Sequence, residues 1–501
     1  MRDTFTNLTN ENLPLMHRDQ VDIKPDKVWL GGLSPNGVVG TSNKTSNPTV
    51  FAVQAKTGIG LLPLDDVFQV HIQNYSTGDA IGLADNNLVL GPKSTYTAEW
   101  AIVPAADYFD FINATRRLLD TNFSFDGSFA FMRADPRYEG KWSDQQIIDF
   151  AKYKDAKYLS INIGYPNYKG KVPQGTAFQQ IDHTAVLDAI ARRRKLVPDA
   201  KQLNYFHCFI DVADEAPEKF KDSRIIMPDG KQADYGKDYL KLFLPTQTNS
   251  YGAAIGKNID IILDDFKLDG VYWDELSRSR YSYTYGENQW DGCSADIDPK
   301  TMQITRLKGS VTLLSLPWRL EHAKDIMKRG ILIANGGNPP TREMRALHFP
   351  AFNETGSITN CVNSQLYSPI ALGDHLTERS EEDAYHTMLK ALDYGCVYYW
   401  YFDLTVIPKY HTLTQYMFPI TPVELHEGYI IGKERIITNH SGVFGWNDNA
   451  KHEVHVFDNT GREVLLDKLP KGTVAKTYQK DGKTWTEIRI GEDWSAVIVR
   501  K

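Results

Sequence analysis

The sequence predicts an α/β protein whose centre is a (β/α)8 barrel, with one antiparallel β-sandwich before it and another after it. Three observations support this architecture. The middle of the chain alternates short apolar runs with amphipathic segments, which is typical of parallel strands joined by helices. The two ends carry short alternating runs separated by Gly, Asn, Thr and Ser, which is typical of antiparallel sheets. The length of 501 residues allows two or three domains.

The two ends of the chain are predicted to be the β-sandwiches. Residues 1–105 form the first, and residues 106–124 are predicted to be a helical linker with its helix at 108–119. Residues 415–501 form the second. Strands are expected at residues 67–73 and 94–102 in the first sandwich and at residues 434–438, 453–457 and 494–499 in the second.

Residues 125–414 are predicted to form the barrel. A helix is expected to begin after Ser143, whose hydroxyl makes a good N-cap. A doubly wound open sheet is the alternative, although no glycine-rich phosphate-binding turn follows the first strand. The eight barrel strands are expected at residues 128–132, 157–163, 203–211, 268–275, 330–335, 347–354, 365–370 and 396–403. Further helices are expected at residues 180–195, 250–266, 311–329 and 380–394.

Composition excludes several classes of function. The net charge of −7 offers no basic field, so nucleic acid is not an expected partner. No apolar run reaches 18 residues, so we expect no membrane span. The four cysteines form no CxxC pair, which argues against a metal knuckle or a disulfide framework. The first residues lack the apolar core of a signal peptide, so we expect a cytoplasmic protein, or an exported one whose leader has been removed.

The most informative stretch is the predicted fourth strand, where an apolar run ends in the adjacent carboxylates of Asp274 and Glu275. Residues at the C-terminal end of a barrel strand face the cleft, where a carboxylate can act as nucleophile or proton carrier. Side chains alternate along a strand, so Tyr272 and Asp274 share one face while Trp273 and Glu275 share the other. A solvated turn with no catalytic role is the alternative interpretation.

This strand resembles those of the retaining glycoside hydrolases with TIM barrels, in particular the α-glycosidase-like clans. Their fourth strand often reads Asp-Gly, three residues, then the nucleophilic Asp. Asp269-Gly270 followed by Asp274 has this spacing, and the resemblance therefore implies that Asp274 is the nucleophile. Amylase-type relatives have Arg two residues before the nucleophile, whereas this chain has Tyr272, so the match is to the spacing.

A retaining mechanism requires a second carboxyl group about 5 Å from the first. The fifth strand ends at Asn335 and supplies no acid, unlike the amylase-type enzymes. The sixth ends in Phe352-Asn353-Glu354, and we expect Glu354 to be the acid/base, with a pKa raised by apolar neighbours. Glu354 could instead cap the next segment. If the fourth strand is offset by one residue, Glu275 faces the cleft and replaces Asp274 as the nucleophile.

Other polar and aromatic residues at the predicted strand ends are candidates for binding a sugar. Carboxylates and amides bind hydroxyl groups, and aromatic rings stack on the C–H faces of sugars. Structural ion pairs and core packing are the alternative roles for these residues. The predicted substrate-binding residues are Tyr272, Trp273, Asp211, His207, Asn335, Asp374, His375, Trp400 and Asp403.

The sequence therefore predicts a glycosidase that acts on an oligo- or polysaccharide. A polysaccharide lyase acting on a uronate, or a carbohydrate-binding protein without catalytic activity, are the alternatives. No cofactor is expected, and no HxH or HExxH metal motif is present. If a metal binds, Ca²⁺ held by Asp269, Asp274 and Glu275 is the choice that oxygen ligands favour. The sequence does not indicate an oligomeric state.

Overall fold

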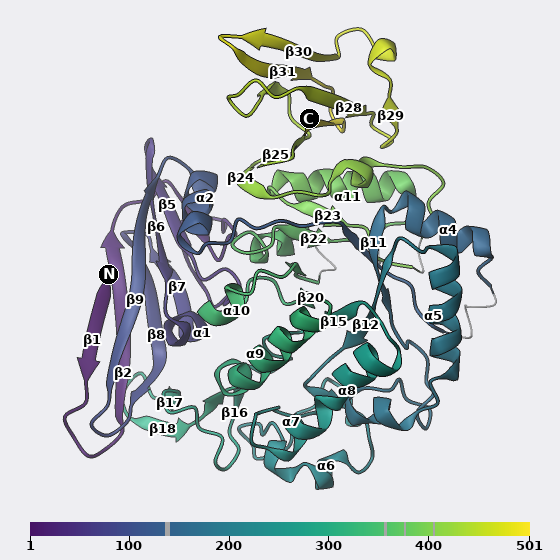
Figure 1. The fold of residues 1–501 in the computed structure, drawn as a ribbon. Helices are drawn as coiled ribbons and strands as arrows, with labels where there is room; N and C mark the ends of the chain where they lie inside the picture. The colour runs from purple at the N-terminus through teal and green to yellow at the C-terminus, as the bar shows by residue number, and fades with distance from the viewer. Residues whose placement is uncertain (136–140, 355–357, 375–376, 404–405) are drawn as a thin grey trace. The chain divides into compact units, whose positions relative to one another are not determined.

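The chain divides into two compact units, each assembled from segments that are distant in sequence. The computed structural model describes residues 1–135, 141–354, 358–374, 377–403 and 406–501. Both units combine parallel strands, helices and antiparallel sheets, so the fold is mixed α/β (Figure 1). The first unit contains Met1–Thr115, Tyr165–Asp182 and Tyr205–Phe349, and the second contains Arg116–Gly164, His183–Asn204 and Pro350–Lys501.

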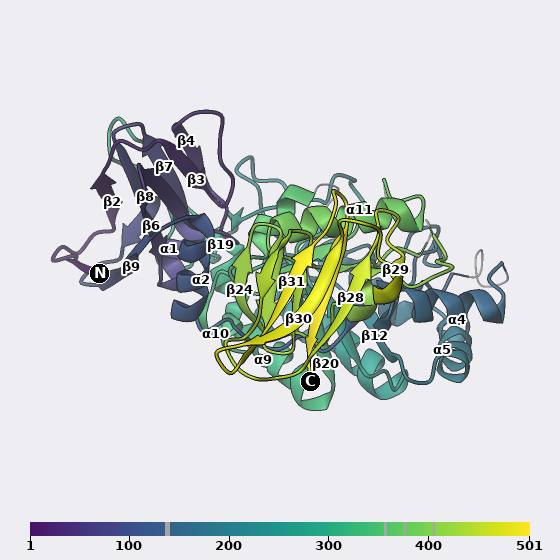
Figure 2. The same ribbon diagram turned by 90° about the horizontal axis from the view of Figure 1, so that it is seen from above.

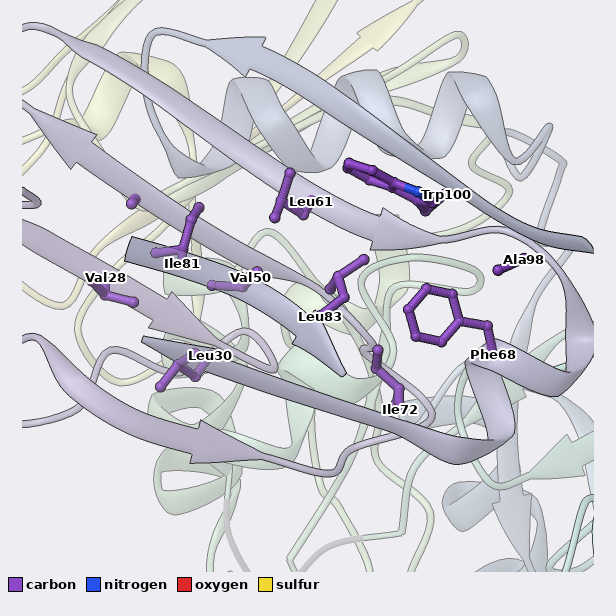
Figure 3. Packing of buried hydrophobic residues seen from close by; sticks show 11 residues of the cluster. Val28, Leu30, Val50, Leu61, Phe68, Ile72, Ile81, Leu83, Ala98 and Trp100 are labelled. Atoms are coloured by element: carbon purple, nitrogen blue, oxygen red, sulfur yellow. The ribbon is translucent and has the colours of Figure 1, made fainter. Parts of the chain in front are cut away.

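The N-terminal part of the first unit is a β-sandwich of two antiparallel sheets. The larger sheet has the strand order β1-β9-β6-β5-β3, and the smaller has β2-β8-β7-β4. Its core draws Val28, Val50 and Leu61 from the larger sheet and Ile81 and Leu83 from the smaller one (Figure 3). The strands are β1 (Arg2–Thr6), β2 (Leu13–Asp22), β3 (Lys27–Leu30), β4 (Val39–Ser42), β5 (Val50–Gln54), β6 (Thr57–Pro63), β7 (Ile72–Thr77), β8 (Ala80–Leu90) and β9 (Thr95–Ala105).

The prediction of a strand at residues 67–73 is wrong. A helix, α1 (Asp66–His71), occupies most of this segment, and β7 starts only after it. Asp65 caps the helix, because its carboxylate accepts the backbone N–H of Phe68 at 3.0 Å. Phe68 and His71 lie three residues apart on one buried helix face, so the apolar pattern also fits helical spacing.

A parallel pair of strands in the first unit carries the predicted carboxylates. β15 (Gly270–Trp273) pairs with β20 (Ile331–Asn335), and the two run side by side in Figure 1. The backbone N–H of Asp274 donates to the carbonyl of Phe206 at 2.8 Å, so the end of β12 lies beside the end of β15. The predicted helix at residues 311–329 is confirmed as α9 (Val311–Arg329), which packs against both strands.

The other elements of the first unit are short. The helical segment predicted at residues 250–266 is confirmed, although it is split into two short α-helices and a π-helical turn. These elements are α2 (Tyr108–Leu118), which ends in the second unit, η1 (Gly175–Gln180), β13 (Ile210–Asp211), α6 (Ala216–Lys219), η2 (Lys221–Ser223), β14 (Lys241–Leu242), α7 (Ser250–Ile255), α8 (Lys257–Asp260), η3 (Ile261–Asp265), β16 (Tyr283–Thr284), β17 (Ala295–Ile297), β18 (Ile304–Leu307), β19 (Gly309–Ser310) and α10 (Arg342–Arg345).

The second unit contains two runs of parallel strands. β10 pairs with β11, and β11 pairs with the start of β12. β22 pairs with β23, and Asn353 bridges to Ala371 of β22 in parallel. The N–H of Phe131 donates to the carbonyl of Tyr401 at 2.8 Å and connects the two runs. The elements are β10 (Ser128–Phe131), α4 (Asp144–Tyr153), β11 (Ala156–Ile161), α5 (Thr184–Leu196), β12 (Lys201–Phe206), β21 (Ala351–Phe352), η4 (Ile358–Asn363), β22 (Ile370–Leu372), α11 (Glu381–Asp393), β23 (Val397–Tyr399) and η5 (Leu413–Tyr416).

Four of the predicted barrel strands have wrong boundaries. The strand expected at 347–354 is only β21 (Ala351–Phe352), and the one expected at 396–403 is only β23 (Val397–Tyr399). The strand expected at 203–211 ends at Phe206, and Ile210–Asp211 pairs separately with β14. The strand expected at 365–370 begins only at Ile370, directly after Pro369. Proline has no N–H to give to a sheet, which explains why the strand starts after it. The helix predicted after Ser143 is confirmed, with a capping box that Ser143 forms with Gln146.

The C-terminal part of the second unit is built from two further antiparallel sheets, seen from above in Figure 2. The sheet orders are β24-β25-β26-β32-β28-β29 and β27-β31-β30. Ile436 and Ile498 of the first sheet and Phe444 and Ile488 of the second share one core. The elements are β24 (Pro422–His426), β25 (Tyr429–Gly432), β26 (Arg435–Thr438), β27 (Gly442–Phe444), β28 (His452–Phe457), β29 (Glu463–Val464), η6 (Leu466–Lys468), β30 (Val474–Lys480), β31 (Lys483–Arg489) and β32 (Ser495–Arg500). Among the described residues, no helix combines the length and apolarity that crossing a bilayer requires.

Candidate active site

The candidate site lies at the carboxyl end of β15. All four residues of this strand, Gly270–Trp273, are buried, and Asp274 and Glu275 follow it directly. Gly270 is required for the strand pairing, because a Cβ atom there would lie 2.1 Å from the carbonyl oxygen of Ile331 on β20. The glycine of the Asp-Gly motif thus lets β15 approach β20, and the rigid pair fixes where the two carboxylates emerge.

Three neutral donors hold the Asp274 carboxylate. The Tyr205 hydroxyl donates to Oδ2 at 2.9 Å. The Asn335 amide donates to Oδ1 at 2.7 Å, and the Tyr272 hydroxyl donates to the same oxygen at 3.3 Å. These donors come from the ends of β12, β20 and β15, so adjacent strands converge on one carboxylate. The arrangement orients Asp274 without placing a cation against it.

The surroundings of Asp274 raise the pKa of its carboxyl group. Burial is the largest cause, and the adjacent negative charge of Glu275 adds to it. His207 opposes the shift, as do the hydrogen bonds from Asn335 and Tyr205, because they stabilise the ionised form. Asp274 therefore exchanges its proton closer to neutral pH than an exposed aspartate does.

Glu275 lies in a different polar environment, although it is the next residue. Its Oε2 accepts hydrogen bonds from His207 Nε2 at 3.0 Å and from the Ser279 hydroxyl at 2.6 Å. Its Oε1 accepts from the Tyr235 hydroxyl at 2.9 Å. Burial acts to raise the pKa of Glu275, but the hydrogen bonds from His207, Ser279 and Tyr235 outweigh it, and the pKa is lowered. Glu275 is therefore held as an anion.

The backbone at Glu275 is strained. Its φ angle is +48°, in the left-handed region that side chains other than glycine rarely adopt. Such conformations persist where the surrounding structure fixes them, and they are concentrated at functional sites. Here the turn reverses the chain after Asp274 and brings Glu275 to His207, Tyr235 and Ser279.

His207 is oriented by the backbone of its own loop. Its Nδ1 accepts the N–H groups of Phe209 at 3.1 Å and Ile210 at 3.2 Å. A nitrogen that accepts two hydrogen bonds carries no hydrogen, so the proton resides on Nε2, which donates to Glu275. His207 therefore positions Glu275. Among the described residues, the hydrogen bond of its Nε2 goes to Glu275 and not to Asp274.

The two aromatic residues of β15 have different surroundings. Tyr272 extends toward Asp274, consistent with the shared face expected from strand alternation. Trp273 is fully buried and its ring lies 5.9 Å from Trp318 of α9 and 5.0 Å from Phe206. This packing makes Trp273 a core residue, and we do not retain it as a sugar-stacking residue.

The side chain of Asp211 also makes structural contacts. Its carboxylate accepts the N–H and hydroxyl of Thr176, both at 2.7 Å, and the N–H of Ala213 at 2.8 Å. Burial raises the pKa of Asp211 to about 6. These contacts of Asp211 join two segments of the first unit. Asn335, which was also predicted to bind substrate, donates to Asp274 and orients it.

The calcium site predicted from three carboxylates is not formed. Asp269 precedes β15 and Asp274 follows it. The four residues of β15 lie between them, so an extended chain places their Cα atoms about 16 Å apart, which is much too far for both to bind one Ca²⁺ ion. The strand that delivers Asp274 and Glu275 thus removes Asp269 from the site.

The remaining predicted residues belong to the second unit. Asp403 accepts the N–H of Arg133 at 2.9 Å and pairs with its guanidinium at 3.5 Å, while burial raises the pKa of the Asp403 carboxyl. Asp374 accepts the Thr377 hydroxyl at 2.8 Å. Trp400 is fully buried, with the ammonium of Lys154 4.7 Å from its ring centroid.

The predicted acid/base, Glu354, is exposed and lies just beyond the end of β21, after Asn353. Its charge is one of the factors that raise the pKa of Tyr401, so the two side chains are near each other within the second unit. His375 lies outside the described residues. The pairing of Asp274 with Glu354 stays a prediction.

Several residues of the site were not predicted from the sequence. Tyr205 is two residues before His207, so strand alternation at the end of β12 could have placed both on one face. Tyr235 and Ser279 lie in loops, where no periodic pattern indicates their direction. Arg133 follows β10 and pairs with Asp403. This pairing can be predicted only when the ends of both strands are known.

Comparison with known proteins identifies the fold. No protein-family model and no curated protein sequence matches the chain. The GH36 alpha-galactosidase AgaA from Geobacillus stearothermophilus, in complex with stachyose, matches with a TM-score of 0.53 and 10% identity over 99% of this chain and 76% of its own. An alpha-galactosidase from Lactobacillus brevis matches with a TM-score of 0.53 and 11% identity over 99% of this chain and 77% of its own.

A third solved structure agrees with these two. The GH36 alpha-galactosidase AgaB from Geobacillus stearothermophilus has a TM-score of 0.53 and 10% identity over 99% of this chain and 76% of its own. At this level of sequence identity the similarity is one of fold. The chain shares the mixed α/β fold of these alpha-galactosidases.

Proposed function

We propose that the protein is a glycoside hydrolase that cleaves a glycosidic bond by a retaining mechanism with two carboxylates. The observation that carries the proposal is Asp274, fixed by three hydrogen bonds at the end of a buried parallel strand. The fold shared with alpha-galactosidases supports the same class of reaction. A carbohydrate is therefore the proposed partner.

The proposal includes closure of the parallel strands into a (β/α)8 barrel. The first unit supplies the end of β12 with β15 and β20, and the second supplies β10, β11 and the start of β12 with β21, β22 and β23. β12 takes part in both sets. Together these are eight parallel strands that alternate with helices, and a (β/α)8 barrel requires eight strands.

Asp274 is the proposed nucleophile. Its carboxylate oxygen attacks the anomeric carbon and forms a glycosyl ester, while the bond from that carbon to the leaving oxygen breaks. The hydrogen bonds from Tyr205, Tyr272 and Asn335 keep the carboxylate in one orientation. The attacking oxygen is therefore held in place before the substrate binds.

Glu354 is the proposed acid/base. It gives its proton to the leaving oxygen in the first step and takes one from water in the second, when that water attacks the glycosyl ester and releases Asp274. Its place just beyond the end of β21, after Asn353, supports this role, because residues at the ends of barrel strands face the cleft. In a crystal structure, carboxyl groups about 5 Å apart support retention, whereas about 6.5–9.5 Å supports inversion.

Glu275 is proposed to act through its charge. The contacts with His207, Tyr235 and Ser279 hold both of its oxygens and lower the pKa of its carboxyl group, so Glu275 stays ionised beside Asp274. Its fixed negative charge, adjacent to the nucleophile, stabilises the positive charge that develops on the sugar in the transition state.

The proposed substrate is an α-galactoside in an oligosaccharide. The neighbours with this fold are alpha-galactosidases, and AgaA is described in complex with stachyose and with raffinose. Purified protein should therefore release galactose from stachyose or from an aryl α-galactoside. A product that absorbs in the near ultraviolet would instead indicate a lyase, and binding without turnover would indicate a carbohydrate-binding protein.

Replacing Asp274→Asn tests the assigned nucleophile. We expect kcat to fall by roughly 10⁴-fold or more, because an amide cannot form the glycosyl ester. Glu275→Gln should lower kcat by roughly 10²-fold, since it removes charge stabilisation and leaves the nucleophile in place. Circular dichroism and thermal unfolding of both variants check that the fold is retained. A larger loss for Glu275→Gln than for Asp274→Asn would contradict the assignment.

A further inference from the structure

A second polar cluster lies where the insertion at residues 277–309 meets the N-terminal sandwich, within the first unit. His71 ends α1, Asp85 belongs to β8, and Asp291, Cys293 and Ser294 belong to the insertion. The backbone joins the two parts here, because Val89 donates to the carbonyl of Cys293 at 2.8 Å and Leu88 bridges to Ser294. The function proposed above makes no use of this cluster.

The cluster has the connectivity of a serine–histidine–aspartate triad but not its chemistry. Asp85 Oδ2 lies 2.8 Å from His71 Nδ1, and the Ser294 hydroxyl lies 2.7 Å from His71 Nε2. Ser294 is fully buried, and its hydroxyl donates to Asp291 at 2.5 Å. The serine hydrogen is therefore not available to His71, and no substrate can reach the oxygen.

The same geometry suits a metal ion. A ring nitrogen of His71, an Asp291 oxygen and Cys293 Sγ all lie within 4.8 Å of one another. Nitrogen, carboxylate and thiolate ligands at about 2.0–2.3 Å are the set that Zn²⁺ prefers. Asp85 holds the other ring nitrogen of His71, which is the outer-shell contact that orients histidine ligands in zinc proteins.

We propose that His71, Asp291 and Cys293 form a binding site for a divalent transition metal of the zinc class. The Ser294 hydroxyl lies 2.7 Å from His71 Nε2, 2.5 Å from Asp291 and 3.9 Å from Cys293 Sγ, so it stands among the three ligands. Its oxygen, or a water molecule, completes the four positions of a tetrahedral site.

Binding of the ion releases the thiol hydrogen of Cys293, because a thiolate is the form that binds metal ions. Asp85 stays 2.8 Å from Nδ1 of His71 and holds the ring in place.

The site would join the insertion to the sandwich. Asp291 and Cys293 lie 12 and 14 residues beyond Ser279, the insertion residue that donates to Glu275. Lys308 supports the same junction, donating to Asn87 at 2.8 Å and to Asp296 at 2.6 Å. A metal here therefore stabilises the base of the loop whose other end contacts the candidate active site.

Titration with Co²⁺ under reducing conditions tests the proposal without measuring activity. We expect one equivalent to bind per chain, with a sulfur-to-cobalt charge-transfer band that Zn²⁺ abolishes by displacement. Cys293→Ser should remove this band while Cys208, Cys361 and Cys396 remain, and it should also remove the rise in melting temperature that Zn²⁺ produces in the wild-type protein.

The control is Glu287→Gln, which removes an exposed carboxylate from the same insertion and should bind Co²⁺ like the wild type. Cys293 is partly exposed and serine places a hydroxyl where the thiol was, so Cys293→Ser is expected to fold. Failure of the wild type to bind Co²⁺, or a thiolate band that survives in Cys293→Ser, would overturn the proposal.

Discussion

Asp274 and Glu275 are adjacent in sequence, but their environments shift the pKa values of their carboxyl groups in opposite directions. Burial raises the pKa of Asp274, whereas hydrogen bonds from His207, Ser279 and Tyr235 lower that of Glu275. Their position at the end of a strand could be predicted from the apolar run that precedes them.

The partners of these carboxylates could not be predicted in the same way. Tyr205 lies 69 residues from Asp274 in sequence, and Tyr235 lies 40 residues from Glu275. They meet their carboxylates only because neighbouring strands and loops converge, and periodicity within one segment carries no information about that convergence. The buried aromatic residues show the same limit, since Trp273 and Trp400 are core residues that resemble stacking residues in the sequence.

Tyr205→Phe tests the environment of Asp274 through the pH dependence of activity. The Tyr205 hydroxyl stabilises the ionised carboxylate, so its removal raises the pKa of Asp274 further. Since the nucleophile must be ionised, the acidic limb of kcat/KM should move to higher pH. The comparison is Tyr272→Phe, whose hydroxyl lies 3.3 Å from Asp274 and should shift the limb less. A limb that stays in place or moves to lower pH would show that Asp274 is not the ionising group.

At the scale of elements, capping signals and periodicity predicted the helices well. The capping box at Ser143 and the long helix at residues 311–329 are both confirmed. The segment that became α1 was predicted wrongly, because its apolar residues satisfy both the period of a strand and that of a helix. Asp65, which caps α1, was the signal that could have decided between them.

Gly270→Ala tests whether the glycine of the Asp-Gly motif is needed for strand pairing. A Cβ atom at this position would lie 2.1 Å from a backbone oxygen of β20, so the two strands must separate. We expect the free energy of unfolding to fall by at least about 2 kcal/mol. The control is Gly91→Ala, where a Cβ atom would meet only the Ser94 hydroxyl at 3.8 Å. Equal stability of the two variants in urea denaturation would argue against this role.

Arg116 at the end of α2 is a second test at this scale. Its buried guanidinium donates to the carbonyls of Gln365 at 2.6 Å, Tyr367 at 3.1 Å and Thr121 at 2.9 Å. Arg116→Met leaves these buried carbonyls without their donor, and we expect a loss of about 3–5 kcal/mol in the free energy of unfolding. Arg117→Ala, at an exposed neighbour, should change stability by less than about 0.5 kcal/mol. Similar denaturation midpoints for the two variants would contradict this account.

At the scale of the whole molecule, the alternation of strands and helices predicted a mixed α/β protein with antiparallel sheets at both ends. The structure has these features, and alpha-galactosidases share its fold. What the sequence did not predict is that each compact unit collects segments from several regions of the chain. Contacts between distant segments decide this grouping, and β12, which spans the boundary, gives no sign of it in its own residues.

The central claim is that Asp274 attacks the anomeric carbon, and trapping the glycosyl-enzyme tests it most directly. An activated fluorosugar α-galactoside, which forms the ester quickly and hydrolyses slowly, should add one sugar mass to the intact protein. Peptide mapping should then locate that mass on Asp274. A label on Glu275, or efficient turnover with inverted product and no covalent adduct, would contradict the account.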